Sequence, residues 1–476
     1  MKRNYIITIL SLIILLAYRQ PLQGQNYFSG PITEDTRWSG SVYLDGDVIV
    51  KPGALLEIDR GTRIIVKPNS DSRKSGADPE RTEIIVEGRL QAIGGDITGS
   101  IIFTSEESSP QMNDWYGIVD KNRKEASEFR HVVVEYAYKG ITCYGSSPQI
   151  ENSEIRFNHH SGVSCEVRAA PLIDKCVIVG NGFAGINCVL GSQPQVSQTI
   201  ISQNTHGVVI FSKSQPDLGR YPVRASASSG ENRINNNFDY DIYNQSGETV
   251  YAQNNFWQSE RYSEIDKSVY DRQENSRSGE VITRPTFTAA RRRSLPVAAV
   301  PPPDSVKEKT VDSTAVAVLQ NVPVITSRQP EETMSRLKPD TVQEKLPEKA
   351  EQSNPETLLV QKEKPPETPP EIEPVIPREP LLEAFLDAGR REYLQRKKPE
   401  YPRIYQQTGT EGNVLVEVQV DRKGKIEDYH ILHSDGKLFT EAVQEALKAF
   451  RYKPGTYQGR PVKFKLVERF QFRKGK

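Results

Sequence analysis

The sequence predicts three parts in order: an all-β right-handed parallel β-helix, a Pro-rich disordered linker and a small α+β domain. A repeat of 23 residues with short apolar–polar alternation predicts the first part. Proline usage predicts the second, because 16 of the 32 prolines lie between Pro296 and Pro380. One alternating strand pattern followed by one helical pattern predicts the third. The expected boundaries are a signal peptide at 1–24, the β-helix at 26–290, the linker at 291–379 and the last domain at 380–476.

Length and composition limit the class of protein. A chain of 476 residues is too long for one ordinary hydrophobic core, so several domains are expected. Lys plus Arg and Asp plus Glu both number 62, and the formal charge is zero. This balance removes the simplest electrostatic argument for a nucleic-acid partner, and we expect none. An apolar content of 36% indicates that part of the chain does not fold.

The first residues have the pattern of a secretory signal. Lys2 and Arg3 precede an apolar run from Ile6 to Tyr18. As a helix this run would rise about 20 Å, short of a bilayer core of about 30 Å. We therefore expect cleavage near Gly24 and an exported envelope protein, with a retained or lipid-facing anchor as the alternative.

The front part repeats itself at a fixed offset. Three sets of residues are each 23 apart: Pro148, Pro171 and Pro194; Ile155, Ile178 and Ile201; Asn158, Asn181 and Asn204. Such a period predicts a solenoid, and the alternation in GVSC (162–165) and GINC (185–188) predicts strands. A further coil is expected at Ile234 and Asn237, after an insertion of about ten residues.

The repeat also predicts columns of equivalent side chains about 4.8 Å apart. Cys143, Cys165 and Cys188 form one column whose next member is Ile210. Cysteine therefore stands where aliphatic residues stand, and we interpret these thiols as small apolar filler. One disulfide is the alternative. A metal site is disfavoured because no CxxC or CxxxH is present, so we expect no metal and no cofactor.

The repeated asparagines and glycines predict turns. We expect the asparagine column to stack at a tight turn, because Asn tolerates left-handed geometry and bonds neighbouring main chain. The glycines at 162, 185 and 207 are expected to supply a positive φ at a second turn.

The front part resembles the parallel β-helix family of secreted bacterial proteins. The resemblance rests on the repeat and on EIIVEGRLQAIG (83–94), IIFTS (101–105), DWYGI (114–118) and YAQNNFWQS (251–259). It is specific for the fold and unspecific for activity. Many members of this family are polysaccharide lyases or hydrolases, so the resemblance brings an enzyme into consideration.

One carboxylate pair fits such chemistry. Glu151 and Asp174 hold the same place in neighbouring coils, which puts their main chains about 4.8 Å apart, near the separation in a retaining glycosidase. The next member is Ser197, and no column of Arg or Lys is expected beside the pair. We therefore expect a solvated stack and assign no catalytic residue. A glycan lyase or hydrolase is the alternative.

Histidines and aromatic residues of the front part are expected to be structural. His160 and His206, with Phe183 between them in the repeat, are interpreted as exposed turn residues rather than ligands. Rim and cap packing is favoured over sugar stacking for Trp115, Tyr116, Tyr136, Tyr138 and Trp257. The polar outer faces of a solenoid suit a glycan or protein ligand, without a residue that can be assigned to it.

The last domain reads as strand, strand, helix and strand. Val414, Val416, Val418 and Val420 alternate strictly, and Ile426 to Leu432 returns after the turn at 421–424. Apolar residues from Phe439 to Phe450 have helical spacing, and RPVKFKLVERFQF (460–472) is the last strand. An amphipathic helix is expected over 380–398 as a lead-in.

This domain resembles the TonB C-terminal domain. The matching residues are Tyr401, Pro402, Gly412, Asp421, Gly424, Ser434, Ala442, Ala446, FRYKP (450–454), GRPV (459–462), Phe470 and Phe472. In that family the last strand lends its free edge to a short peptide of an outer-membrane receptor, beside a Pro-x-Tyr-Pro segment. The resemblance therefore implies an outer-membrane TonB-dependent receptor, or a similar envelope protein, as partner. It implies these partner-binding residues: Pro399, Tyr401, Pro402, Val462, Phe464, Leu466, Phe470 and Phe472.

Two departures from the family pattern bear on function. Lys398 stands where the family often has Gln, and Ser11 is followed four residues later by Leu15 instead of His. Energy transduction is therefore not expected, although receptor docking is. We expect a non-catalytic protein in the periplasm of a Gram-negative-type cell, associated with either membrane or with neither. It would take part in TonB-type transport, with a β-helix that binds an envelope glycan or protein. A membrane-anchored energy transducer is a further alternative.

Overall fold

A computed structural model describes residues 26–95, 99–288, 380–388 and 391–474. The predicted signal peptide at 1–24 and the predicted linker at 291–379 lie outside the described residues. All described residues belong to one of the two compact units of the chain, which comprises residues up to Pro296 and from Ile376. Within it, residues 26–288 are called the front solenoid and residues 380–474 the C-terminal module.

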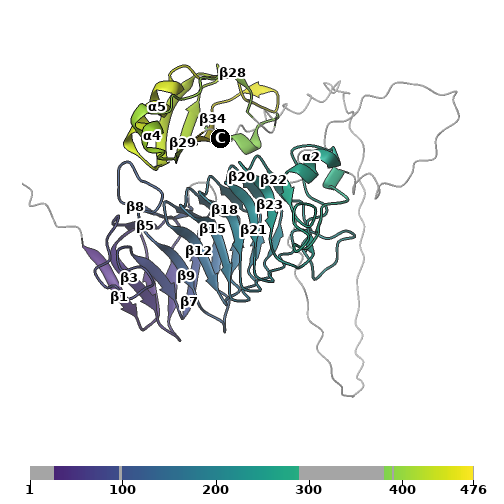
Figure 1. Cartoon of the computed structure of the whole chain (residues 1–476). Coiled ribbons are helices and arrows are strands. Elements are labelled where there is room, and N and C mark those ends of the chain that lie inside the picture. Colours follow the sequence, from purple (N-terminus) through teal and green to yellow (C-terminus); the bar gives the residue numbers. More distant parts are fainter. Residues whose placement is uncertain (1–25, 96–98, 289–379, 389–390, 475–476) are drawn as a thin grey trace, which may run out of the picture. The chain divides into compact units, whose positions relative to one another are not determined.

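The front solenoid is built almost entirely from short strands (Figure 1). Its elements are β1 (Tyr27–Ile32), β2 (Thr36–Trp38), β3 (Ser41–Val50), β4 (Leu55–Ile58), β5 (Arg63–Val66), β6 (Glu83–Val86), β7 (Arg89–Ile93), β8 (Ile101–Ser105), β9 (Gly117–Asp120), β10 (Glu128–Arg130), β11 (Val132–Glu135), β12 (Lys139–Tyr144), β13 (Gln149–Glu151), β14 (Glu154–Arg156), β15 (Ser161–Glu166), β16 (Leu172–Asp174), β17 (Val177–Val179), β18 (Ala184–Cys188), β19 (Gln195–Ser197), β20 (Ile200–Ser202), β21 (His206–Ile210), β22 (Arg233–Asn235), β23 (Tyr240–Asn244), β24 (Val250–Tyr251), α2 (Tyr262–Lys267), β25 (Val269–Tyr270) and β26 (Val281–Ile282).

Strands of successive coils pair in parallel and form three faces. One face runs through β5, β8, β11, β14, β17, β20 and β22. A second runs through β6, β9, β12, β15, β18, β21, β23 and β25. The third is the seven-stranded sheet from β2 to β19. Figure 1 shows β9, β12, β15, β18 and β21 side by side. The predicted parallel β-helix is confirmed.

The register of the strands reproduces the predicted columns. Ile155, Ile178, Ile201 and Ile234 are successive partners and are fully buried, so the coil predicted after the insertion is present. Cys143, Cys165, Cys188 and Ile210 follow one another in the same way on the second face. All four cysteines of the chain are buried free thiols, which confirms their interpretation as core filler.

The asparagine column forms a buried ladder of side-chain bonds. Asn158 Nδ2 donates to Asn181 Oδ1 at 3.0 Å, and Asn181 Nδ2 donates to Asn204 Oδ1 at 2.9 Å. Each Oδ1 also accepts from the main-chain N of the preceding asparagine in the column, at 3.1 and 2.9 Å. Stacking and main-chain bonding are as predicted. The prediction of a left-handed conformation was wrong, because none of these three residues has a positive φ.

The prediction that the repeated glycines supply a positive φ was also wrong. Gly162, Gly185 and Gly207 do not have positive φ. Instead there is no room for a side chain: a Cβ on Gly162 would lie 2.9 Å from both Asn181 Nδ2 and Gly185 O. The left-handed positions belong to other columns of mixed composition, such as Asn152, Lys175 and Gln198 (φ 49°, 52° and 51°).

A buried carboxyl group lies at one end of the thiol column. Asp120 is the register partner of Val86 and Cys143 and is fully buried. Its Oδ1 accepts from Asn122 N at 3.1 Å, whereas Oδ2 has no bonding partner among the described residues. Burial raises the pKa of Asp120 to about 7 despite the bond from Asn122.

The C-terminal module folds around one sheet and one main helix. Its elements are β27 (Leu381–Leu382), η2 (Glu383–Phe385), β28 (Tyr393–Gln395), α4 (Arg403–Thr408), β29 (Gly412–Val420), β30 (Ile426–Ser434), α5 (Lys437–Leu447), β31 (Arg451–Tyr452), β32 (Thr456–Tyr457), β33 (Arg460–Pro461) and β34 (Phe464–Phe472). The sheet order is β27-β34-β29-β30, and β29 is antiparallel to both long neighbours. Phe439, Val443 and Leu447 of α5 are buried against this sheet. The predicted hairpin and helix are confirmed. The predicted last strand is present as β34 but begins at Phe464, because Arg460 and Pro461 pair with β32 as β33.

The predicted lead-in helix at 380–398 is wrong. Its described residues form β27, the short 3₁₀ turn η2 and β28 instead. Leu381 pairs with Phe464 of β34, and Tyr393 pairs with Tyr452 of β31. Long-range strand pairing therefore overrides the helical spacing of the leucines.

Asp120 gives the solenoid a pH-dependent stability. Because the folded carboxyl keeps its proton up to about pH 7, whereas the ordinary value is 3.8, its contribution to the free energy of unfolding is largest below pH 4 and is lost as pH rises to about 7. Asp120→Asn should remove this loss. Urea unfolding between pH 4 and 8 measures it, and half-exposed Asp174→Asn is the control that keeps it. An identical pH profile in wild type and Asp120→Asn would refute the assignment.

Candidate functional site

The predicted partner-binding strand is β34, and its predicted side chains lie in the core. Phe464, Leu466, Phe470 and Phe472 of β34, and Val462 just before it, are each at most 4% exposed. They pack in the hydrophobic cluster that also holds α5 and β29. These side chains hold the strand in place, so only its main chain can offer a contact to another strand.

The main chain of β34 alternates between two neighbours. Leu381 N of β27 donates to Lys463 O at 3.0 Å, on the side away from β29. On that same side Val467 N donates to Gln203 Oε1 at 2.8 Å, and Arg391 Nη1 donates to Val467 O at 2.7 Å. Strand alternation places the groups of Arg469 and Gln471 on this side as well. Among the described residues none bonds their main chain there. The edge is therefore occupied up to Val467 and open beyond it.

Arg391 is the centre of a buried ionic network beside this edge. Its Nη2 lies 2.8 Å from Glu383 Oε2, and its Nη1 lies 3.1 Å from Glu468 Oε1. Both carboxylate side chains are at most 2% exposed. Burial disfavours the charge on Arg391, but the two carboxylates outweigh burial and hold its pKa well above the ordinary value. Tyr393 and Tyr452 complete the network by donating to Glu468 Oε1 at 2.6 and 3.0 Å.

The predicted Pro-x-Tyr-Pro residues line a cavity of about 320 Å³ against α5. Pro399, Tyr401 and Pro402 form one wall, and the other comes from α5, with Leu438 and Ala442. Tyr401 also packs on the last residue of β34, its ring 5.7 Å from that of Phe472. Its hydroxyl donates to Thr410 O at 2.8 Å. The structure thus brings this segment next to the open end of the edge strand.

Further contacts of the C-terminal module involve residues of the front solenoid. Leu415, Leu432 and Val467 form a cluster with Met112 and Phe157. Main-chain and side-chain bonds add to it: Met112 N donates to Leu432 O at 2.9 Å, and Gln111 Nε2 donates to Ile431 O at 2.8 Å. The outer face of the sheet therefore carries apolar side chains with partners inside the same unit.

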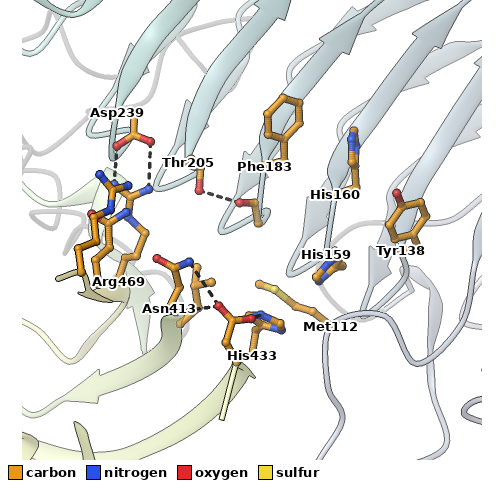
Figure 2. A pocket seen from close by; sticks show the side chains of 15 residues that line it. Met112, Tyr138, His159, His160, Phe183, Thr205, Asp239, Asn413, His433 and Arg469 are labelled. Atoms are coloured by element: carbon orange, nitrogen blue, oxygen red, sulfur yellow. Dashed lines mark hydrogen bonds and ion pairs between the residues drawn. The ribbon is translucent and has the colours of Figure 1, made fainter. Parts of the chain in front are cut away.

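A cavity of about 470 Å³ lies beside this cluster (Figure 2). Arg469 pairs with Asp239 at 2.6 Å, while His433 Nε2 lies 2.9 Å from Asp435 Oδ1. Burial works to raise the pKa of Asp239, but the bonds from Arg469 prevail and lower it. Burial, and then the neighbouring His433, lowers the pKa of His159. Asp239, Arg469 and Asp435 of this cavity therefore have partners within the chain.

The carboxylate pair of the solenoid is neighbouring, as predicted. Glu151 and Asp174 are register partners on the third face. Cations are present beside both: Arg130 Nε lies 3.5 Å from Glu151 Oε2, and Lys175 Nζ lies 3.3 Å from Asp174 Oδ2. The register column runs Arg130, Glu151, Asp174 and Ser197, so these are single cations and no column of Arg or Lys flanks the pair, as expected. Ion pairing is the observed role of these carboxylates.

The histidines and aromatic residues form a stack along the coils. His160 contacts Phe183 with ring centroids 4.8 Å apart, and Phe183 contacts His206 at 5.7 Å. The stack continues to Tyr138 at one end and to Tyr243 at the other. These side chains are half-buried, so the prediction of exposed turn residues was incorrect. Burial lowers the pKa of His160 to about 4, which keeps its ring neutral at neutral pH.

The remaining aromatics mostly serve packing, as predicted. Trp115 is fully buried and donates through Nε1 to Glu135 O at 2.9 Å. Trp257 packs on the solenoid core, and Tyr136 packs on Phe157. No group of three metal-binding side chains occurs within residues 26–95, 99–288, 380–388 and 391–474. In the same ranges no helix has the length and apolar character of a membrane span.

Sequence reasoning missed the groups that occupy the edge of β34. Glu383 and Arg391 lie eight residues apart, and Gln203 belongs to the front solenoid, so no local pattern joins them. The sequence signal is weak: Glu383 interrupts the apolar run LLEAFL (381–386), and Glu468 stands where a buried side chain is found, but Arg391 lies in the charged stretch GRRE (389–392).

Two family models match the chain. Residues 397–473 match the family described as Gram-negative bacterial TonB protein C-terminal. Residues 74–261 match a family described as a protein of unknown function, DUF1565, which is a parallel β-helix family. No curated protein matches the chain. Both parts of the resemblance are thereby confirmed. The first match supports a TonB-like transport role and an envelope location, whereas the second supports a fold and no particular activity.

Removing the central cation should destabilise the C-terminal module. Arg391→Ala leaves the carboxylates of Glu383 and Glu468 buried without their charge partner, so we expect a loss of about 3–5 kcal/mol in the free energy of unfolding. Arg396→Ala is the matched control, because Arg396 is half-exposed and lies 3.9 Å from Glu468. Urea titration of both variants measures the difference. Equal stabilities would show that the network contributes little.

Proposed function

We propose that the chain is a non-catalytic periplasmic protein of TonB-type transport. In this proposal the C-terminal module docks a short extended segment of an outer-membrane receptor by strand addition to β34. The single observation that carries it is a strand at the rim of a TonB C-terminal sheet with outward main-chain groups at Arg469 and Gln471. A partner strand bonds such an edge through its main chain, and side-chain pockets add selectivity.

The predicted partner-binding residues divide into two roles in this proposal. Val462, Phe464, Leu466, Phe470 and Phe472 fix the position of the edge from inside the core. Pro399, Tyr401 and Pro402 offer their cavity to a side chain of the incoming segment. Tyr401 supports this role, because its contact with Phe472 places the cavity wall beside the end of β34.

For the front solenoid we propose binding of an envelope glycan or protein in place of catalysis. Three repetitive faces offer an extended polymer equivalent contacts at each coil, about 4.8 Å apart. The half-buried stack that contains Tyr138, Phe183 and Tyr243 adds aromatic edges along that direction. The ion pairs of Glu151 and Asp174 support this class, because they give both carboxylates a partner within the solenoid.

Site-specific crosslinking in cells tests the docking proposal. A photoreactive amino acid replaces Gln471, which is exposed on β34, or Lys448, which is exposed at the end of α5, as the control. We expect an adduct with an outer-membrane receptor from position 471 and none from position 448. The adduct is identified by mass spectrometry of the outer-membrane fraction. Adducts only within the chain itself, or equal receptor adducts from both positions, would refute strand addition.

Incubation with polysaccharides separates binding from catalysis. The full chain should retain acidic or neutral polysaccharides on an affinity gel without shortening them, as measured by size-exclusion chromatography. Glu151→Gln and Asp174→Asn should leave retention unchanged within a factor of two. Depolymerisation that either substitution abolishes would establish the lyase or hydrolase alternative.

A further inference from the structure

The segment 380–388, called the strap, occupies the first part of the edge to which a partner strand would add. Leu381 and Leu382 pair in parallel with Phe464 and Lys465 of β34. The strap precedes the residues that match the TonB C-terminal family, which begin at 397. It is therefore an addition to the matched segment, placed on the strand where the proposed docking takes place.

Buried side chains anchor the strap. Leu381 and Leu386 are 6% and 7% exposed and belong to the core cluster of the module. Gly455 makes room for one of them, because a Cβ there would lie 2.9 Å from Leu386 Cδ1. Asp387 then accepts from Gln458 N and Gly459 N at 2.9 Å each. The strap thus fills an apolar slot and ends in a fixed turn.

The carboxylate of the strap completes the ionic network. Glu383 is fully buried, and its Oε2 accepts from Arg391 at 2.8 Å and from Gln203 Nε2 at 2.9 Å. Arg391 and Gln203 also bind the main chain of Val467 on the same edge. If the strap left, Arg391 would lose one of its two carboxylate partners in a buried place, which is unfavourable unless another carboxylate replaces it.

We propose that the strap is an internal substitute for the partner peptide. The true partner is then an extended segment that runs parallel to β34, with two adjacent apolar residues followed by an acidic one. The open groups at Arg469 and Gln471 give it only part of the edge, so it must displace the strap to dock along the whole strand. This inference rests on the proposed function and deepens it in two ways. It names the chemistry of the partner, and it describes a resting state in which the strap occupies the docking edge, called the self-occupied state. A strap tethered to its own site has an effective concentration on the order of millimolar, so it competes strongly with a free peptide.

The test uses the full chain and a fluorescein-labelled peptide with the strap's own sequence, PLLEAFLDA (380–388). The displaced form is the double substitution Leu381→Asp, Leu386→Asp, which removes both apolar anchors. Fluorescence anisotropy should show binding to this variant and, for a peptide of about 10 µM affinity, roughly 100-fold weaker binding to wild type. Leu394→Asp is the matched control, because Leu394 is 68% exposed, and it should behave as wild type.

The acidic position is tested with a second peptide. A peptide that carries Gln at the position of Glu383 should bind the displaced form at least tenfold more weakly, because Arg391 then lacks a second carboxylate. Equal affinity of the two peptides would overturn the acidic requirement. Equal affinity of the first peptide for wild type and the displaced form would overturn the self-occupied state. The self-occupied state would also be overturned if the displaced form unfolds cooperatively, which shows that it is folded, and yet does not bind the peptide.

If the double substitution prevents folding, a disulfide that holds the strap on β34 tests the same proposal. Leu382→Cys and Lys465→Cys join register partners of neighbouring strands, within the reach of a disulfide. Oxidised chain should give no receptor adduct from position 471, and reduction should restore it. Equal adducts before and after reduction would overturn the proposal. The peptide experiment involves no receptor, so the two proposals can fail separately. The strap proposal is retained if the peptide binds but no receptor adduct forms. The docking proposal is retained if the adduct forms but the peptide does not bind.

Discussion

Hydrogen bonding between the main chains of neighbouring strands is the constraint on which the whole structure depends. In the front solenoid each coil satisfies the edge of the coil before it, and the side-chain columns follow from that stacking. In the C-terminal module the same need arises once more at β34, whose outward groups have no neighbouring long strand. The chain meets it with β27, Arg391 and Gln203 up to Val467. Beyond that point the outward main-chain groups of Arg469 and Gln471 stay open, and the proposed function places a partner strand there.

The fold was largely predictable because a solenoid repeats the same structural unit at a fixed period, so equivalent residues recur at a constant spacing. The columns of Ile155, Cys143 and Asn158 follow from counting residues, since coil spacing alone makes equivalent residues neighbours. Conformation was harder to predict. A repeated glycine means either a positive φ or a lack of space, and at Gly162 the second cause applies. The true left-handed positions, among them Lys175, carry residues of mixed type and leave no repeat to read.

The candidate site was predictable only in part. The strand, its buried face and its neighbour Tyr401 follow from the alternation and from the resemblance. The strap could not be predicted in this way. The leucines between Leu381 and Leu394 have helical spacing, but their structure is decided by pairing with residues some eighty positions later. The partner Gln203 lies more than 250 residues away from Val467. Local patterns carry no information about such contacts.

In the proposed function the two parts of the chain share a mode of action, in which repeated or exposed strands bind other molecules. The measurement closest to this claim is amide hydrogen exchange of the full chain, resolved to single residues along β34. We expect slow exchange at Leu381 and Val467, whose amides are bonded, and fast exchange at Arg469 and Gln471. Fast exchange at Leu381 and Val467, or uniform protection along the strand, would contradict the claim.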